Sequence, residues 1–429
     1  MGFADPAWVI IRRLVSLCGR RLLATLVALW AVGIAAQIAN AAALPDSTWV
    51  AASVLPGQGH SPVFAIAVDP GNDQAVVAAN SEGTLVRSTN GAATWSAVRQ
   101  GKTPINTIAF DPYVARMVLA GTRGDGAVVS RDGGATWSAA RGLEGRNVRV
   151  FAFALTSVYA GTDKGVFASA DGSSWNATAL TNRAISALAV EAIHDPVRLI
   201  AGTDAQPAGG GLPLFESLDA GATWRQLTPA ITGTMTIRLV AGPLPPTGNV
   251  RPLLVGTNTG LFQSTDNGAT FNPLSGGGGL PTTDYTQADF ITSHHDRFYV
   301  ASDGGGSGSG GVWRSDDGGG AFTSLRPPEP SVTALAVSND EQPVLYVATF
   351  NPATHAASMW AYHDTGGTPV GPVRSPAPVV GGASPARPPD RSSVTQILSS
   401  PQLPYIGLGL GALAVVLTAA VAHMRGRYR

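Results

Sequence analysis

A short motif repeated along the chain constrains the fold more than any other feature of this sequence. The stretch SRDGGATW (130–137) combines a serine, an aspartate, two glycines and a tryptophan. Related copies recur about every 40 to 50 residues, the spacing of repeat proteins such as propellers and solenoids. They are STNGAATW (88–95), SADGSSW (169–175), SLDAGATW (217–224), STDNGATF (264–271) and SDDGGGAF (315–322). Six copies of one motif predict a repeated structural turn rather than six catalytic centres.

Each copy belongs to a longer unit with the pattern of four short strands. Around the second copy, INTIAFDP (105–112), RMVLAGT (116–122) and GAVVS (126–130) are apolar runs bounded by glycine, aspartate or proline. Such runs are typical of β-strands, and a fourth follows the tryptophan. Charged residues make up only 13% of the chain, against roughly 25% in an ordinary domain. Four strands per repeat predict the blades of a β-propeller.

The two ends of the repeat region predict a closed ring of seven blades. A seventh unit, 332–364, has three strands and then runs into proline-rich sequence, so that its fourth strand is missing. The N-terminal stretch STWVAASV (47–54) aligns with ATWSAVRQ (93–100), which makes Trp49 the seventh aromatic of the series. An N-terminal strand that completes the last blade would remove the exposed edges of an open array. We therefore expect an all-β, seven-bladed β-propeller over residues 44–363.

The motif resembles the Asp-box of the BNR repeat, S-x-D-x-G-x-T-W, found in sialidases, sortilin-type receptors and the photosystem II assembly and stability factor family. The resemblance covers roughly residues 47–363 and is closest to the single seven-bladed propellers of the last family, with WD40-like and YVTN-like propellers sharing the architecture. It implies a hairpin turn between the third and fourth strands, away from the active face. Turn aspartates accept hydrogen bonds from backbone N–H groups. The structural box residues are Asn90, Asp132, Asp171, Asp219, Asp266 and Asp317.

Both ends of the chain carry features of membrane targeting. Four arginines precede an apolar run at 22–36 and a stretch of small residues, so residues 1–43 are predicted to be a cleaved export signal or a retained signal anchor. A proline-rich linker is expected over 364–402. The apolar segment 403–424 is long enough to cross a ~30 Å hydrocarbon core, and the basic tail 425–429 would stay in the cytoplasm. The propeller would then be extracytoplasmic, on one membrane span or two.

Composition argues against several kinds of chemistry. The formal net charge is zero, which does not favour nucleic acid as a partner. The single cysteine, Cys18, lies in the N-terminal segment and leaves the repeat region without thiol chemistry. The only histidine cluster, His294 and His295 beside Asp296, occupies the place of the Asp-Pro turn in other blades and is predicted to be a turn. No metal site and no cofactor are expected.

No catalytic residues are predicted. The resemblance to sialidases would require an Arg-Ile-Pro signature, and the nearest sequence, TIRLV around Arg238, lacks the proline. A glycoside hydrolase needs two carboxyl groups at a defined separation, which a sequence does not show. The acids to examine for that activity are those of the loops between second and third strands: Glu82, Asp125, Asp163 and Asp204.

A group of basic residues gives the most specific indication of function. The segments that lead into the first strands of the early blades share one face of a propeller, and they contain Arg99, Lys102, Arg141, Arg146 and Arg183. Relatives in the photosystem II factor family likewise carry a basic patch. We therefore predict a non-catalytic, monomeric scaffold that binds an acidic segment of an envelope or membrane protein. The alternative is a carbohydrate-binding or sialidase-like glycoside hydrolase module.

Overall fold

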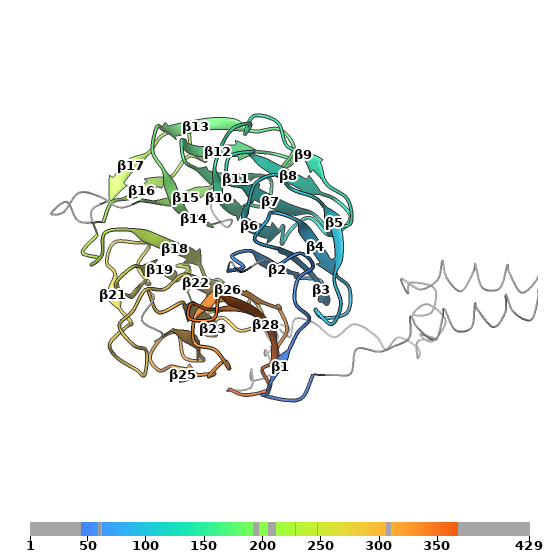
Figure 1. Cartoon of the computed structure of the whole chain (residues 1–429). Coiled ribbons are helices and arrows are strands. Elements are labelled where there is room, and N and C mark those ends of the chain that lie inside the picture. Colours follow the sequence, from blue (N-terminus) through green and yellow to red (C-terminus); the bar gives the residue numbers. More distant parts are fainter. Residues whose placement is uncertain are drawn as a thin grey trace, which may run out of the picture. The chain divides into compact units, whose positions relative to one another are not determined.

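The computed structural model describes residues 44–367, except 59, 61, 192–196, 205–211, 228, 247 and 306–309. These residues form seven four-stranded antiparallel sheets, which stand as blades around a ring (Figure 1). The predicted all-β, seven-bladed propeller is therefore confirmed. The expected N-terminal segment 1–43, the linker beyond residue 367, the span 403–424 and the tail 425–429 lie outside the described residues. In the described part of the chain, no helix has the length and apolar character needed to cross a membrane.

The blades follow one another along the chain, each with its strands in sequence order. Blade one contains β2 (Ile66–Asp69), β3 (Asn72–Ala79), β4 (Leu85–Ser88) and β5 (Ser96–Arg99). Blade two contains β6 (Ile105–Phe110), β7 (Val118–Thr122), β8 (Ala127–Ser130) and β9 (Ser138–Ala139). Blade three contains β10 (Val148–Phe153), β11 (Val158–Thr162), β12 (Gly165–Ser169) and β13 (Asn176–Thr181).

The remaining blades repeat this order, and the last one takes its fourth strand from the N-terminus. Blade four contains β14 (Ile185–Glu191), β15 (Arg198–Thr203), β16 (Leu214–Ser217) and β17 (Arg225–Leu227). Blade five contains β18 (Thr236–Ala241), β19 (Leu253–Thr257), β20 (Leu261–Ser264) and β21 (Asn272–Pro273). Blade six contains β22 (Gln287–Phe290), β23 (Phe298–Ser302), β24 (Gly311–Ser315) and β25 (Thr323–Ser324). Blade seven contains β26 (Val332–Val337), β27 (Val344–Asn351), β28 (Ala356–His363) and β1 (Trp49–Ala51).

Burial explains why the middle strands are continuously apolar. Every residue of β7 and of β11 is buried, because neighbouring blades cover both faces of each sheet, and a strand covered on both sides does not alternate. The short outer strands β9, β21 and β25 are exposed. The core is therefore divided into seams between blades rather than gathered at one centre.

One aromatic residue of the repeat contributes to each seam. Seven apolar clusters lie between consecutive blades, and each contains a single member of the series predicted from the sequence. In blade three, Trp175 is 4% exposed and its indole Nε1 donates to the carbonyl of Gly172 at 3.0 Å. The series around the ring is Trp95, Trp137, Trp175, Trp224, Phe271, Phe322 and Trp49.

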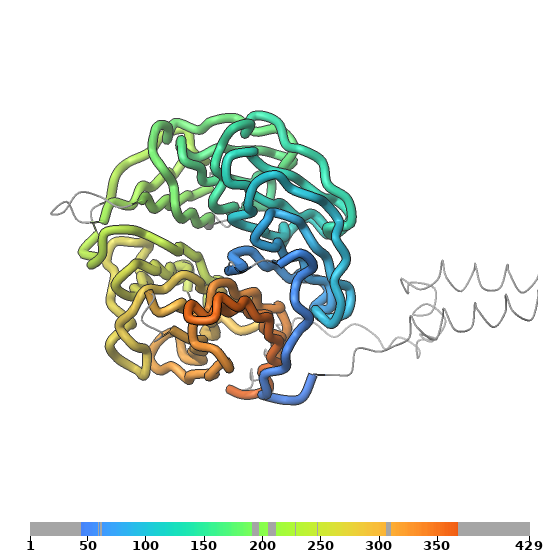
Figure 2. The backbone as a smooth tube through the Cα atoms, in the orientation of Figure 1, coloured from blue at the N-terminus to red at the C-terminus, as the bar shows by residue number. Residues whose placement is uncertain are grey.

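The N-terminal strand closes the ring, as the sequence predicts. Strand β1 pairs with β28 in antiparallel register, Trp49 opposite Tyr362, and Figure 2 shows the N-terminal segment beside the C-terminal end of the propeller. The rings of this pair lie 4.7 Å apart, and Trp49 Nε1 donates to the carbonyl of Leu325 in blade six at 2.7 Å. The first ordered strand thus joins the last two blades.

Antiparallel order gives the propeller two faces with different loops. We call the face that carries the segments between blades and the loops between second and third strands the linker face. The opposite face carries the loops between first and second strands and the turns of the six motifs, and we call it the box face. Residues in these two sets of loops are separated by the length of a strand.

Candidate functional site

The six motif turns on the box face are held by the same set of hydrogen bonds. In blade two, Ser130 Oγ donates to Asp132 Oδ1 at 2.7 Å, and the same oxygen accepts the backbone N–H of Thr136 at 2.8 Å. Equivalent backbone bonds run from Thr94 to Asn90 (3.0 Å), Ser174 to Asp171 (3.1 Å), Thr223 to Asp219 (2.8 Å), Thr270 to Asp266 (2.9 Å) and Ala321 to Asp317 (2.9 Å). These side chains are occupied in holding the turn.

The electrostatics of the turns match this role. Burial by itself raises the pKa of Asp132, but hydrogen bonds from Thr136 and Ser130 outweigh it and lower the pKa to about 2. The same kind of bonds, from Thr270 and Ser264, lower the pKa of Asp266 to about 2. A carboxylate that accepts several hydrogen bonds is stabilised in its charged form. At neutral pH these groups remain charged and are poor proton donors.

Glycine is required at one position of the turn by both conformation and space. Gly134 has a φ of 86°, in the left-handed region that glycine tolerates best. A Cβ atom there would lie 2.6 Å from Val77 Cγ2 of blade one. The turn of blade two therefore closes against its neighbour, which supports the seam between the two blades.

On the linker face, two of the predicted basic residues hold equivalent places in adjacent blades. Arg146 precedes β10 and Arg183 precedes β14, each by two positions. The guanidinium carbon of Arg146 lies 5.9 Å from the ring centroid of Phe167, and that of Arg183 lies 4.7 Å from the ring centroid of Phe215. A cation within about 6 Å of an aromatic face is attracted by the ring quadrupole. Both arginines are therefore positioned by the third strand of the blade that they lead into.

Arg141 lies in the seam between blades two and three, closer to the box face. Its N–H donates to the carbonyl of Ser173 at 2.8 Å, and its carbonyl accepts the N–H of Trp175 at 2.9 Å. Both partners belong to the motif turn of blade three. The carbonyl of Arg146, by contrast, accepts the N–H of Gly126 in the linker-face loop of blade two at 3.0 Å. The segment between blades two and three runs from the box face to the linker face, so that Arg141 lies nearer the box face and Arg146 nearer the linker face.

The other predicted basic residues flank this pair, and the structure adds two that the sequence analysis did not name. Arg99 is half-buried at the end of β5, and Lys102 is exposed in the segment that follows. Arg123 and Lys164 are exposed in the linker-face loops of blades two and three. Arg123 lies two positions before Asp125, and Lys164 directly follows Asp163, so inspection of the same loops in the sequence could have identified both basic residues.

Among the described residues, the five predicted basic side chains lack acidic partners, whereas three of the four acids in the linker-face loops of blades one to four are engaged by neighbouring groups. In the described part of the chain, none of the five predicted basic residues forms an ion pair. Asp125 Oδ2 accepts from Thr103 Oγ1 at 3.1 Å and Asp163 Oδ1 accepts the N–H of Asn147 at 3.1 Å. Asp204 pairs with Arg149 at 2.5 Å. The unpaired positive charge is available to a partner.

The acids nominated for glycoside hydrolysis do not form a pair with one another. Glu82, Asp125, Asp163 and Asp204 belong to the loops of four different blades. The carboxyl groups that do meet are Asp284 and Asp303 of blade six, where burial first, and then the hydrogen bond to Asp284, raise the pKa of Asp303. Glycosidase carboxyl groups stand about 5 Å or more apart. Two carboxyl groups in direct hydrogen-bond contact leave no room for a scissile bond between them.

A second acid with a raised pKa lies on an innermost strand. Burial raises the pKa of Asp289, in β22, to about 6, although Arg238 of the neighbouring blade acts in the opposite direction. Arg238 Nε donates to the carbonyl of Ala288 at 3.2 Å. Arg238, the arginine of the TIRLV sequence, thus links blades five and six.

The histidine cluster lies in the box-face loop of blade six, between β22 and β23. His295 Nε2 contacts Asp296 Oδ2 at 2.9 Å, and the two imidazole rings stack with centroids 6.2 Å apart. Among the described residues, no group of three or more histidine, cysteine or acidic side chains is arranged to hold a metal ion.

Comparison with solved structures shows the same fold in other proteins. YCF48 from Cyanidioschyzon merolae is 14% identical, with a TM-score of 0.51 over 73% of this chain and 98% of that protein. U3-55K is 12% identical, with a TM-score of 0.53 over 75% of this chain and 100% of the other. An ancestral GH74 enzyme is 18% identical, with a TM-score of 0.46, and the match spans 55% of its length. No family model and no curated protein matches the chain.

The likenesses to YCF48 and U3-55K are of fold alone, because both identities are below one fifth. Propellers of one architecture serve unrelated functions. The function must therefore be argued from the linker face itself.

Proposed function

We propose that the protein is a membrane-anchored, extracytoplasmic and non-catalytic scaffold whose linker face binds an acidic segment of another envelope protein. The observation that supports this function best is the equivalent placement of Arg146 and Arg183, each with its guanidinium within about 6 Å of a phenylalanine ring of the blade that it leads into. Neither arginine forms an ion pair within the described residues.

The chemistry of arginine favours a carboxylate partner. Its planar guanidinium presents donors in a fixed fork that matches carboxylates, and stacking on a ring restrains the side chain before binding. Two such forks in adjacent blades can hold two acidic residues of one extended segment. Arg123 and Lys164 add positive charge on the same face, which would speed association with an acidic partner.

Anchoring is supported by the sequence at both ends. The arginine-rich start followed by apolar residues, and the apolar segment 403–424 with its basic tail, together favour export of the propeller and its retention at the membrane.

Cross-linked affinity capture of the full-length protein from its native membranes tests the proposal. We expect one discrete protein partner, lost when Arg146→Glu and Arg183→Glu are combined, because charge reversal turns attraction into repulsion. The captured amount should also fall as salt is raised, since exposed charges are screened.

The matched control is Arg141→Glu, which reverses the same charge beside the motif turn of blade three and should leave capture unchanged. Equal capture by the wild type and the double variant would overturn the acidic-segment proposal. If no protein is captured at all, the scaffold function itself is wrong, and glycan binding by the propeller becomes the function to test.

A further inference from the structure

Both ends of the propeller leave from the box face of blade seven. Strand β28 ends there at His363, and the N–H of Ser47 donates to the carbonyl of His363 at 2.8 Å. Ser47 Oγ and Thr365 Oγ1 lie 3.1 Å apart, and Asp46 forms a parallel bridge with His363. Figure 2 shows the first described segment (blue) beside the end of the last described one (orange-red). Residues 44 and 367, where the described chain begins and ends, thus belong to one face.

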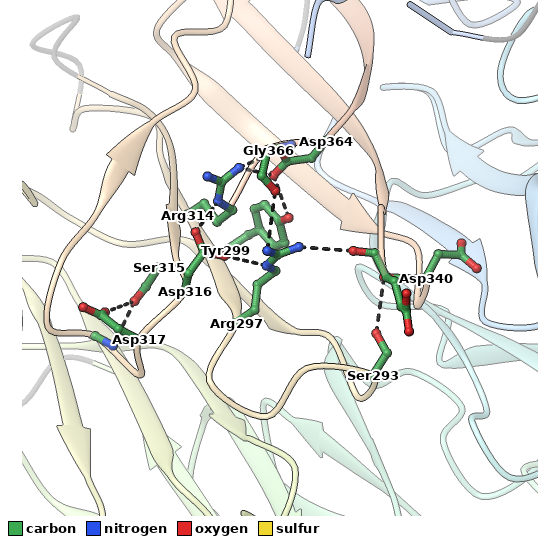
Figure 3. A network of polar contacts seen from close by, with 12 residues as sticks. Ser293, Arg297, Tyr299, Arg314, Ser315, Asp316, Asp317, Asp340, Asp364 and Gly366 are labelled. Carbon is green, nitrogen blue, oxygen red and sulfur yellow. Dashed lines mark hydrogen bonds and ion pairs between the residues drawn. The ribbon is translucent and has the colours of Figure 1, made fainter. Parts of the chain in front are cut away.

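A buried polar network fixes the direction of the C-terminal exit (Figure 3). Arg314 Nη1 donates to both oxygens of Asp364 at 2.6 and 2.8 Å, and the hydroxyl of Tyr299 donates to the same carboxylate at 2.8 Å. Arg297 Nη2 reaches the carbonyl of Gly366 at 3.5 Å. Asp364 is fully buried. Asp364 and Gly366 are therefore held against blade six.

The box face also carries most of the exposed apolar side chains. Seven large hydrophobic residues of the described chain are exposed, and only Val54 and Phe64 lie outside the box-face loops and turns. The other five are Tyr113 (44% exposed), Val114 (44%), Leu155 (63%), Leu218 (54%) and Leu244 (38%). Four of them occupy loops between first and second strands, in blades two, three and five. These side chains lie in loops of four different blades on one face, so a single flat surface could contact several of them together.

We propose that the box face docks onto the surface of the lipid bilayer to which the chain is anchored, with the loop tips at Tyr113, Val114, Leu155 and Leu244 entering the headgroup boundary. The inference rests on the membrane anchor of the proposed function. Tyrosine and leucine are residues that suit this boundary, where apolar groups leave water and the phenol hydroxyl stays hydrated.

The lengths of chain outside the described residues support lipid as the occupant. Residues 37–43 separate the N-terminal apolar run from residue 44, and an extended segment of that size reaches at most about 25 Å. A retained signal anchor would therefore hold the box face close to the bilayer. If the signal is cleaved, the chain toward segment 403–424 still leaves from the same face. With the box face docked, the linker face points away from the membrane and stays open to a partner.

Depth-dependent fluorescence of the full-length protein in phosphatidylcholine vesicles tests this docking. In a Cys18→Ser background, an environment-sensitive label is placed at Leu155→Cys or, in a second variant, at Leu244→Cys. The matched control is Phe64→Cys, because Phe64 is 49% exposed but precedes the first strand of blade one, near the linker face. All three positions are exposed, so labelling should not disturb the core.

We expect the labels at 155 and 244 to shift to shorter emission wavelength and to lose intensity when the lipids carry brominated acyl chains, with no change at 64. Labels at all three positions that emit as in water, in protein that stays in the vesicles after a carbonate wash, would overturn the docking while the anchor stands. Protein removed by the wash would overturn the anchor and the docking together. Capture of the acidic partner is measured separately and does not depend on either result.

Discussion

At the scale of single residues, the surroundings lower the pKa of one aspartate and raise the pKa of another. Asp132 sits in a motif turn, where hydrogen bonds lower its pKa to about 2 despite burial. Asp289 sits on an innermost strand, where burial raises its pKa to about 6 and Arg238 offsets this only in part. The first aspartate stabilises the fold as an anion, whereas the second is accommodated best as the neutral acid.

This contrast predicts opposite pH trends for two substitutions. An acid whose folded pKa exceeds its unfolded value of about 3.9 contributes stability below pH 4, and the contribution is lost as pH rises through 6. Asp289→Asn should therefore leave the free energy of unfolding near the wild-type value at pH 4 and raise it by about 2 to 3 kcal/mol at pH 7.5. Urea unfolding of both proteins across this range measures the difference.

The control for that measurement is Asp132→Asn, which should lower the free energy of unfolding at neutral pH, because the lowered pKa of Asp132 contributes stability above about pH 4. Asparagine fits the turn, as Asn90 accepts the equivalent bond in blade one. A pH-independent difference between Asp289→Asn and the wild type would contradict the raised pKa.

At the scale of strands and turns, the sequence predicted the features that recur in every blade but not the contacts that occur in one blade only. The motif spacing predicted the blades, and the alignment around Trp49 predicted that β1 closes the ring. Whether Arg141 lies near the box face or the linker face depends on the path of the segment that connects blades two and three. The position of the arginine in the sequence does not show this path. The network of Arg314 with Asp364 joins two blades through side chains that belong to no repeated pattern.

The same network predicts a large effect at the closing blade. Asp364→Ala would leave the Nη1 of Arg314 and the hydroxyl of Tyr299 buried without their acceptor, while Asp316 still pairs with Arg314, so we expect the free energy of unfolding to fall by about 1 to 3 kcal/mol. Asp46→Ala is the matched control, because Asp46 pairs with His363 beside the same strand but its side chain is 75% exposed. An exposed pair contributes about 0 to 1 kcal/mol. Similar urea midpoints for the two variants would show that the buried network does not stabilise the closure.

At the scale of the whole molecule, the two proposed functions belong to different faces: partner binding to the linker face and membrane docking to the box face. Arg146 and Arg183 are positioned on the linker face by phenylalanine rings. The chain ends and the exposed apolar loop tips belong to the box face. The proposed docking of the box face on the membrane would leave the basic residues of the linker face turned toward partners, so that neither proposed activity would obstruct the other.

This arrangement predicts the result of shortening the linker. Deleting residues 376–395, which the sequence gives as proline-rich, should leave capture of the acidic partner unchanged, because the proposed docking of the box face turns the linker face away from the bilayer whatever the tether length. If the linker face instead pointed toward the membrane, a short tether would press it against lipid and capture would fall. Cross-linked capture from membranes measures this, with replacement of the same segment by glycine and serine as the control for sequence-specific roles. Capture that is lost on deletion and kept on replacement would reverse the assigned orientation.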